Sequence, residues 1–323
     1  MLFGMRFDLR HPSFSPVSPT DRYRACVDMC EWADQRGAVF VALSEHHGSD
    51  DGYLPSPLPL AAAIAARTSD VVIGINALVA PFHDPLRLAE DAAVVDLVSG
   101  GRLALTLAGG YVRGEFEMFG VPPAERGRRV EEAVATLRAA WTGEPFEHRG
   151  RTVTVRPTPA SESGPALLLG GTSDAAARRA ARIADGFVPS DLACWGAYRD
   201  ECLRLGKPDP GPGRAEAGGE VVVLAEDPEA AWERLGPYFL HESNAYGRWQ
   251  AESGLPTPYR TAPDVEALRA TGQYRILTPD AYREELDGAG EAAMVVLHPM
   301  VGGIPPDLAW EHLRLFDRTF LDG

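Results

Sequence analysis

Ionisable side chains stand directly after a short apolar run near the start of this sequence. Glu45, His46 and His47 follow Phe40–Leu43. A histidine titrates near neutral pH and can act as a general acid or base, which a neighbouring carboxylate can orient or tune. The alternative is a structural histidine hydrogen-bonded across the strand end. Three ionisable residues together are costly to bury without a role. We therefore predict that one of these two histidines acts as a general acid or base.

The two histidines do not predict a metal site. Adjacent side chains at the end of a strand point to opposite sides, so His46 and His47 are not expected to bind one ion. Neighbouring strand ends also lack evident carboxylates to complete a ligand set. We expect no metal.

A glycine-rich turn precedes a predicted helix over Asp174–Ala184. It consists of Gly170, Gly171, Thr172 and Ser173. Glycine lets a phosphate approach the backbone, the N–H groups of a helix N-terminus face the anion, and the hydroxyls add donors. The alternative is that Thr172 or Ser173 only caps the helix.

Short strand-like runs alternate with amphipathic stretches along the whole chain. Eight predicted strands, nearly all followed by helices, favour a parallel sheet closed into a (β/α)₈ TIM barrel. An open dinucleotide-binding sheet would have a glycine-rich turn after its first strand, where Leu9–Pro12 stands here. The predicted strands are Met5–Leu9, Phe40–Leu43, Val71–Ala77, Arg102–Leu107, Ala166–Leu169, Gly186–Val188, Glu220–Leu224 and Ala292–Leu297.

Functional groups of a parallel barrel follow the C-terminal ends of its strands. This places further candidates beside the histidine pair, although polar loops follow every strand in any case. The additional candidates are His11, Asn76, Ala77, Gly110, Tyr111, His298 and Met300. Of these, we assign His11, His298 and Met300 to the substrate, together with His47.

One segment, His241–Thr278, does not fit the alternation. The helix predicted before it spans Pro228–Leu240. We interpret the segment as a long insertion before strand eight, within a single domain spanning 1–323. Its aromatic residues, among them Tyr246 and Trp249, and its glycines and prolines predict a lid over the barrel mouth that contacts substrate. The alternative is a surface excursion packed on the outer helices.

The composition is that of an ordinary globular protein. The 323 residues are 45% hydrophobic and carry a net charge of −15, without a basic cluster, which argues against a nucleic-acid partner. No secretory signal and no apolar run of membrane-spanning length is evident. We expect a cytoplasmic protein without a membrane partner.

Taken together, these motifs resemble the bacterial luciferase-like flavin-dependent monooxygenase family, most densely between Val41 and Gly120. The order and spacing of the short pieces carry the resemblance. They are Ser44–His47, Ile73-Gly74, Pro81, Asp84–Glu90, Leu97–Arg102, Gly110-Tyr111, Glu115-Phe116, Phe119-Gly120, Gly170–Ser173 and Ala184–Gly186.

The resemblance implies a barrel that binds FMN, or the deazaflavin F420, at its strand C-termini. His46 matches the family's catalytic histidine, and Gly171, Thr172 and Ser173 match its phosphate-binding turn. Asn76-Ala77 matches a bulge that often carries a non-prolyl cis peptide behind the flavin ring, near which Gly110 and Tyr111 would lie. The luciferases have cysteine and arginine before the Gly-aromatic pair, and that arginine helps hold the phosphate; Ala108 and Gly109 stand there in this chain. Relatives are commonly homodimers.

We therefore predict a two-component FMN-dependent monooxygenase in which His46 acts as general acid or base and Glu45 orients it or tunes its charge. Since no nicotinamide-binding motif is visible, reduced FMN would come from a separate, transiently bound flavin reductase. O₂ would form a flavin C4a-peroxide that oxygenates a small organic substrate, and this intermediate needs a dry pocket. Two alternatives remain open: an F420-dependent reductase or dehydrogenase on the same fold, and a non-catalytic flavin-binding relative.

Overall fold

The structure is a computed structural model in which the chain forms two compact units. Unit 1 comprises Met1–Ala42, His47–Pro55 and Ala217–Gly323, and unit 2 comprises Leu43–His46 and Ser56–Glu216. The described residues are 1–213, 220–254, 259, 261–289 and 294–321.

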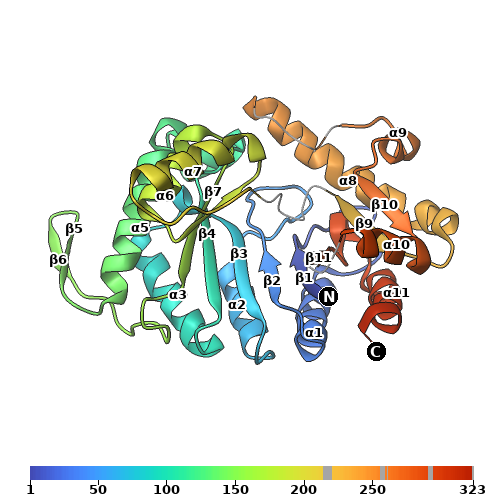
Figure 1. Cartoon of the computed structure of the whole chain (residues 1–323), viewed down its shortest axis with the longest axis horizontal. Helices are drawn as coiled ribbons and strands as arrows, with labels where there is room; N and C mark the ends of the chain where they lie inside the picture. Colours follow the sequence, from blue (N-terminus) through green and yellow to red (C-terminus); the bar gives the residue numbers. More distant parts are fainter. Residues whose placement is uncertain (214–219, 255–258, 260, 290–293, 322–323) are drawn as a thin grey trace. The chain divides into compact units, whose positions relative to one another are not determined.

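Unit 2 contains a run of four parallel strands. They follow one another in the order β3 (Val72–Val79), β4 (Leu103–Ala108), β7 (Ala166–Gly171) and β8 (Gly186–Pro189) (Figure 1). Leu105 and Leu107 of β4 are completely buried. Short apolar runs of this kind are typical of parallel strands, whose two faces are both covered.

Helices connect the strands of unit 2. The α-helices are α2 (Pro57–Ala65), α3 (Pro85–Ser99), α4 (Arg113–Phe119), α5 (Arg126–Trp141), α6 (Asp174–Ile183) and α7 (Trp195–Arg204). Three short 3₁₀ turns are η1 (Ala80–Phe82), η2 (Pro123–Glu125) and η3 (Leu192–Cys194), and an antiparallel hairpin pairs β5 (Phe146–His148) with β6 (Arg151–Val153).

Helix α3 shows how local sequence sets the ends of these elements. The Asp84 carboxylate accepts hydrogen bonds from the backbone N–H groups of Leu86 and Arg87, Pro85 occupies the first turn, and Gly100 ends the helix with a φ of 70°. An acidic N-cap, an early proline and a left-handed glycine are the ordinary start and stop signals of a helix. They place the start of β4 three residues after Gly100.

Unit 1 contains the two ends of the chain. Its strands are β1 (Leu2–Phe7), β2 (Phe40–Leu43), β9 (Val221–Leu224), β10 (Tyr274–Leu277) and β11 (Met294–Leu297). Strands β11, β1 and β2 lie in that order, and β9 pairs with β10 in a separate parallel ladder; Leu43 of β2 is counted with unit 2. Its helices are α1 (Pro19–Gln35), α8 (Pro228–Ser253), α9 (Val265–Arg269), α10 (Pro279–Ala289) and α11 (Pro306–Phe316), with the short turns η4 (Val301–Gly303) and η5 (Asp317–Leu321).

Each of the eight predicted strands has a counterpart in the structure. The limits differ by one to three residues at most ends, and Ala292 at the start of the last predicted strand lies outside the described residues. Parallel strands surrounded by helices are thus confirmed. Within the described part of the chain the ladders of each unit are open runs, whereas the sequence predicts a closed ring.

The prediction of an irregular segment over His241–Thr278 is wrong for much of its length. Helix α8 does not stop at Leu240 but continues to Ser253, with Pro237 and Gly247 inside it, and Tyr274–Leu277 forms β10. The breakers are tolerated because burial of residues such as Phe239 and Tyr246 outweighs their low helix propensity. No helix of the described residues is both long and apolar enough to span a bilayer.

The Arg102 side chain stabilises the chain segments at the start of β4. Its guanidinium donates to the carbonyls of Ala65, Thr68, Val71 and Ser99 and to the Thr68 hydroxyl, at 2.7 to 3.2 Å. These groups belong to the end of α2, the segment leading to β3 and the end of α3. The rigid guanidinium of Arg102 therefore holds three chain segments together at the N-terminal ends of β3 and β4.

We predict that Arg102→Lys lowers the free energy of unfolding by about 2–4 kcal/mol, since lysine has three donors and leaves part-buried carbonyls unpaired. Urea denaturation followed by circular dichroism measures this change. The control is Arg87→Lys on α3, where the arginine side chain is 72% exposed and pairs only with surface carboxylates. Equal stability of the two variants would contradict this role.

Candidate active site

A buried histidine–carboxylate pair lies in unit 2, and its histidine follows strand β2 in the sequence. His46 is 8% exposed, and its Nδ1 is 2.8 Å from Oε1 of Glu115, a residue of α4 that is 1% exposed. An ionised carboxylate only accepts hydrogen bonds, so His46 donates from Nδ1. Nε2 faces the Tyr111 hydroxyl at 3.4 Å, with the two rings edge to face. Nε2 is therefore the nitrogen at which a proton can be taken up or released.

Glu45 has different contacts from those predicted. Its carboxylate, completely buried, accepts from the backbone N–H of Val79 at 2.7 Å and from Nε2 of His83 at 2.8 Å. The preceding Ser44 hydroxyl donates to the Asn76 carbonyl at 2.9 Å. Both residues thus hold the C-terminal end of β3. Glu115 occupies the position beside His46 that the sequence assigned to Glu45.

The sequence reasoning missed Glu115 and His83 as functional candidates. Glu115 follows β4 by seven residues, beyond the loop positions directly after the strand, and lies 69 residues from His46. The sequence does carry a signal, because Glu115 is a charged residue of the motif Glu115-Phe116, in a short helix that ends at Gly120. His83 lacked a comparable signal.

The predicted backbone irregularity at Asn76-Ala77 is confirmed. The peptide bond between these residues is cis, and the pairing of β3 with β4 shifts register between Asn76 and Leu78. Both residues are half-buried. They lie in the part of β3 that Ser44 and Glu45 hold.

Gly110 shapes the loop that carries Tyr111. Its φ is +73°, and a β-carbon there would lie 2.8 Å from Cγ1 of Val79. A left-handed φ and this close approach both require glycine. The turn directs the chain into α4, which brings Glu115 back to His46.

The Gly170–Ser173 turn joins the end of β7 to α6. Gly171 packs against the first turn of the helix, where a β-carbon would lie 2.5 Å from that of Ala176. The Ser173 hydroxyl accepts from the N–H of Ala176, so the capping alternative is correct for this oxygen. Thr172 is half-buried and Ser173 exposed. The turn nonetheless presents bare backbone and the first N–H groups of a ten-residue helix, which is a donor set that fits a phosphate group.

The six predicted substrate or lid residues lie in unit 1. Tyr246, His298 and Met300 are buried, whereas the other three are partly exposed; these are His11, His47 and Trp249. His11 donates from Nε2 to the carbonyl of Val17. Burial and the nearby Arg6 guanidinium hold the pKa of His298 well below its usual value, so this ring is neutral.

Arg10 is a buried arginine around which several side chains of unit 1 pack. The sequence did not predict this role. Its guanidinium lies 4.7–4.8 Å from the ring centroids of Tyr53, Tyr246 and Trp249 and forms an ion pair with Asp51. Three aromatic faces and a carboxylate compensate the desolvation of the charge. Tyr246 and Trp249 therefore anchor α8 around Arg10.

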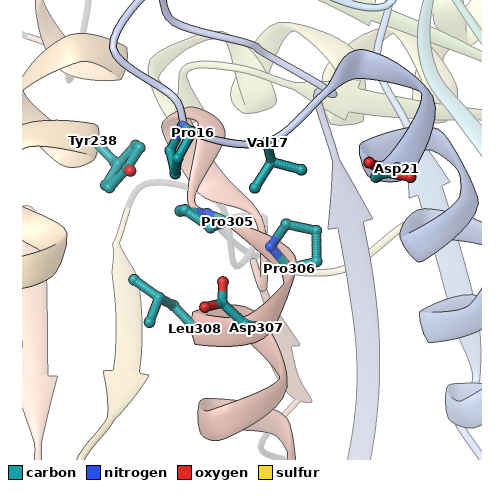
Figure 2. Close-up of a pocket in the computed structure, with 8 residues that line it drawn as sticks. All are labelled: Pro16, Val17, Asp21, Tyr238, Pro305, Pro306, Asp307 and Leu308. Carbon is teal, nitrogen blue, oxygen red and sulfur yellow. The ribbon is translucent and has the colours of Figure 1, made fainter.

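Unit 1 also holds an open groove of about 440 Å³ (Figure 2). Apart from Asp21, Asp307 and the hydroxyl of Tyr238, its lining is apolar. The residues that line it are Pro16, Val17, Asp21, Tyr238, Pro305, Pro306, Asp307 and Leu308. None of the predicted site residues is among them.

Comparisons with known proteins place this chain in a family. The model of the luciferase-like monooxygenases matches residues 1–297, so the chain belongs to that family. It is 30% identical over 154 residues to the oxygenase component of flavin-dependent trigonelline monooxygenase from Acinetobacter baylyi, covering 46% of this chain and 42% of that protein.

A second relative is an FMNH₂-dependent dimethylsulfone monooxygenase from Pseudomonas putida, 30% identical over 153 residues, or 45% of this chain and 41% of that protein. The chain thus spans about two-fifths of the length of these curated relatives. Among solved structures it resembles monooxygenase RslO1 from Streptomyces bottropensis, with a TM-score of 0.75 and 26% identity over 99% of both chains.

Glu242 on α8 provides a test of the buried charges of unit 1. It is completely buried, accepts from the Tyr274 hydroxyl at 2.7 Å, and has a pKa raised to about 7 by burial and by nearby Asp8. A raised carboxyl pKa stabilises the fold below the unfolded pKa near 4.5, and this contribution is lost as pH rises through about 7.

We therefore predict that the stability of the native protein relative to Glu242→Gln falls by about 3 kcal/mol between pH 4.5 and pH 8. Paired urea titrations across this range measure the difference, and groups common to both proteins cancel. A difference that does not change with pH would contradict the assignment.

Proposed function

We propose that this chain is the oxygenase component of a two-component, FMN-dependent monooxygenase that oxygenates a small organic substrate. The observation that carries the proposal is the buried Glu115–His46 pair with Tyr111 at Nε2. The same unit also holds a strand-end turn that suits a phosphate. The relatives that act with FMNH₂ or as an oxygenase component support it. We further propose one domain, a closed eight-stranded barrel, and a cytoplasmic homodimer.

The cofactor would be held by residues of unit 2. Gly170, Gly171, Thr172 and Ser173 would bind the phosphate, and the ring would lie near Asn76, Ala77, Gly110 and Tyr111. Reduced FMN, supplied by a separate flavin reductase, provides the electrons that activate O₂ for transfer of one oxygen atom to the substrate.

The protein residues would handle protons and position groups. Glu115 keeps a hydrogen on Nδ1 of His46, so that Nε2 alone exchanges a proton with the reacting groups. Tyr111 orients Nε2 through its hydroxyl. Glu45 acts one step away, by holding the end of β3 against the segment that carries His46. Substrate contacts are assigned to residues of unit 1: His11, His47, Tyr246, Trp249, His298 and Met300.

The direct test supplies reduced FMN from a flavin reductase, together with ¹⁸O₂ and a panel that includes trigonelline and dimethylsulfone. Incorporation of one ¹⁸O atom into a product, detected by mass spectrometry, is the expected result. Reduction or oxidation of substrate with F420, independent of O₂, would contradict the proposal in favour of the F420 alternative.

We predict that His46→Gln lowers the rate of product formation at least 100-fold while the dissociation constant of FMN changes less than fivefold, because general acid–base catalysis typically contributes 10²–10⁴-fold. Single-turnover kinetics and fluorescence titration measure the two quantities. Turnover within twofold of the native protein would instead support a non-catalytic role for this histidine.

We predict that Glu115→Gln lowers the rate of product formation about tenfold, since the amide removes the charge that fixes the Nδ1 hydrogen bond. The matched control is Glu117→Gln on the same helix, whose side chain is 69% exposed and pairs with Arg113. If both variants lose the same activity, Glu115 has no specific role in positioning His46.

A further inference from the structure

Arg22 of α1 is a completely buried arginine that contacts two loops of unit 1. Its Nη1 donates to the carbonyl of Ile304 at 3.0 Å, and its Nη2 donates to the carbonyl of Gly303 at 2.7 Å. The same Nη2 donates to the Ser15 hydroxyl at 3.1 Å. One guanidinium thus joins the loop after β1 to the turn after β11.

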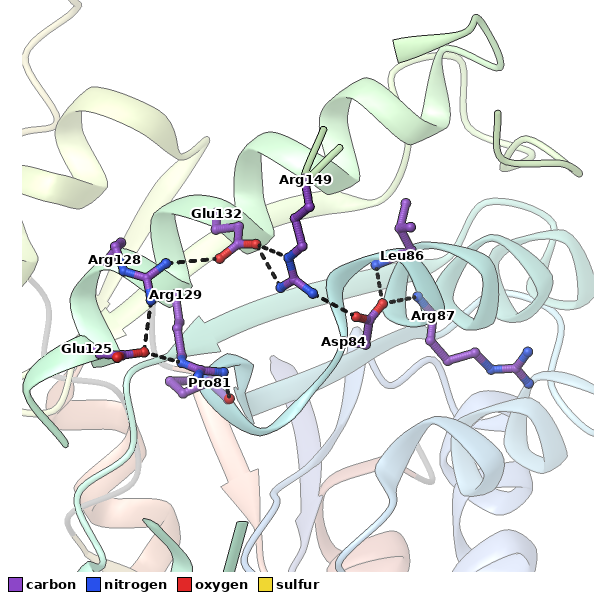
Figure 3. Close-up of polar contacts among 9 residues, drawn as sticks. All are labelled: Pro81, Asp84, Leu86, Arg87, Glu125, Arg128, Arg129, Glu132 and Arg149. Atoms are coloured by element: carbon purple, nitrogen blue, oxygen red, sulfur yellow. Dashed lines mark hydrogen bonds and ion pairs between the residues drawn. The ribbon is translucent and has the colours of Figure 1, made fainter. Parts of the chain in front are cut away.

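The charge of Arg22 is buried without an ion pair. Among the residues that the structure describes, its hydrogen-bond partners are two carbonyls and a hydroxyl, and burial lowers the pKa of the guanidinium. Arg128 on the surface of α5, by comparison, pairs with Glu125 and Glu132 (Figure 3). A buried cation whose partners are neutral costs free energy. The hydrogen bonds of Arg22 therefore have to outweigh that cost.

The turn after β11 begins with His298 and Met300, which are assigned to the substrate. The carbonyl of Met300 accepts from the N–H of Gly303 at 3.1 Å. Gly303 has a φ of +95°, and a β-carbon there would overlap the ring of Pro12. The Gly303 carbonyl that Arg22 holds therefore belongs to the same tight turn as the two assigned residues.

The loop after β1 carries His11, which is also assigned to the substrate. The His11 ring donates from Nε2 to the carbonyl of Val17 at 2.5 Å, and the N–H of Ser15 donates to the carbonyl of Pro12 at 2.8 Å. The loop is thus closed on itself between these residues. Because Arg22 contacts the Ser15 hydroxyl inside this closed loop, it also holds the segment that positions His11.

Both loops form part of the wall of the open groove in unit 1 (Figure 2). Pro16 and Val17 directly follow Ser15, and Pro305 directly follows Ile304. The groove leaves one side of each loop without tight packing. Hydrogen bonds from the buried side are therefore needed to fix the two loops.

We propose that Arg22 is a positioning residue for substrate binding, which holds together the loops that carry His11, His298 and Met300. This inference rests on the proposed function, which assigns these three residues to the substrate. A planar guanidinium donates to several oxygens in fixed directions at once, which the single ammonium of lysine does not reproduce. The role concerns the substrate, since the flavin contacts are proposed for residues of unit 2.

The first measurement is hydrogen–deuterium exchange of the intact protein without ligands, followed by mass spectrometry. We expect Arg22→Met, which removes the hydrogen bonds, to speed exchange about tenfold in residues 11–17 and 298–305 and less than twofold in β4. Arg22→Lys, which keeps the charge and part of the bonding, should lie between the native protein and Arg22→Met. The control is Arg24→Met, which removes an exposed arginine two residues along α1 and should leave both loops unchanged.

The second measurement is steady-state kinetics with the compound of the trigonelline and dimethylsulfone panel that the native protein oxygenates. We expect Arg22→Met to raise the KM of that compound about tenfold, and Arg22→Lys about threefold, while kcat and the dissociation constant of FMN change less than twofold. Loss of folded protein alone would lower kcat and leave KM unchanged, so the two explanations are separated.

Three results would overturn the inference while the proposed function stands. These are a KM of Arg22→Met within twofold of the native value, faster exchange spread evenly over the whole chain, and an equal effect of Arg24→Met. If the native protein oxygenates no compound with reduced FMN, the proposed function fails, and the role of Arg22 in substrate binding fails with it.

Discussion

The hydrogen bond between Glu115 and His46 is the constraint on which the candidate site depends. A carboxylate that is 1% exposed requires a donor, and Nδ1 of His46 supplies it at 2.8 Å. The bond forms because Gly110 takes a φ of +73° and turns the chain after β4 into α4. The choice of proton position on the imidazole follows from this arrangement, since Nδ1 is occupied and Nε2 faces Tyr111.

The residues around His46 divide between chemistry and support. Ser44 and Glu45 hold the end of β3 through the Asn76 carbonyl and the Val79 N–H. The carboxylate of Glu45 satisfies a strand-end donor that would otherwise be buried without a partner. The short motif Ser44–His46 thus contributes two positioning residues and one group suited to proton transfer, which explains why they occur next to each other.

Several features followed from the sequence because they depend on local patterns. The strands were found because short apolar runs such as Leu103–Ala108 are bounded by glycine and polar residues. The turn Gly170–Ser173 was found because it precedes a capped helix. The sequence predicts too short a helix α8 because Gly247 is a helix breaker, although burial of Tyr246 beside Arg10 compensates for it.

Contacts between residues far apart in the sequence could not be predicted from the local sequence pattern. Arg10 and Asp51 lie 41 residues apart, and Glu115 lies 69 residues from His46. Nothing in the local sequence indicates which buried charge meets which.

The most direct measurement of the central claim is a crystal structure of the protein with bound FMN. The account predicts the isoalloxazine ring in contact with His46 and Tyr111, against the Asn76-Ala77 peptide, and the phosphate at Gly170–Ser173. Density for FMN in the groove of Tyr238 and Pro305, or at any place away from His46, would contradict it.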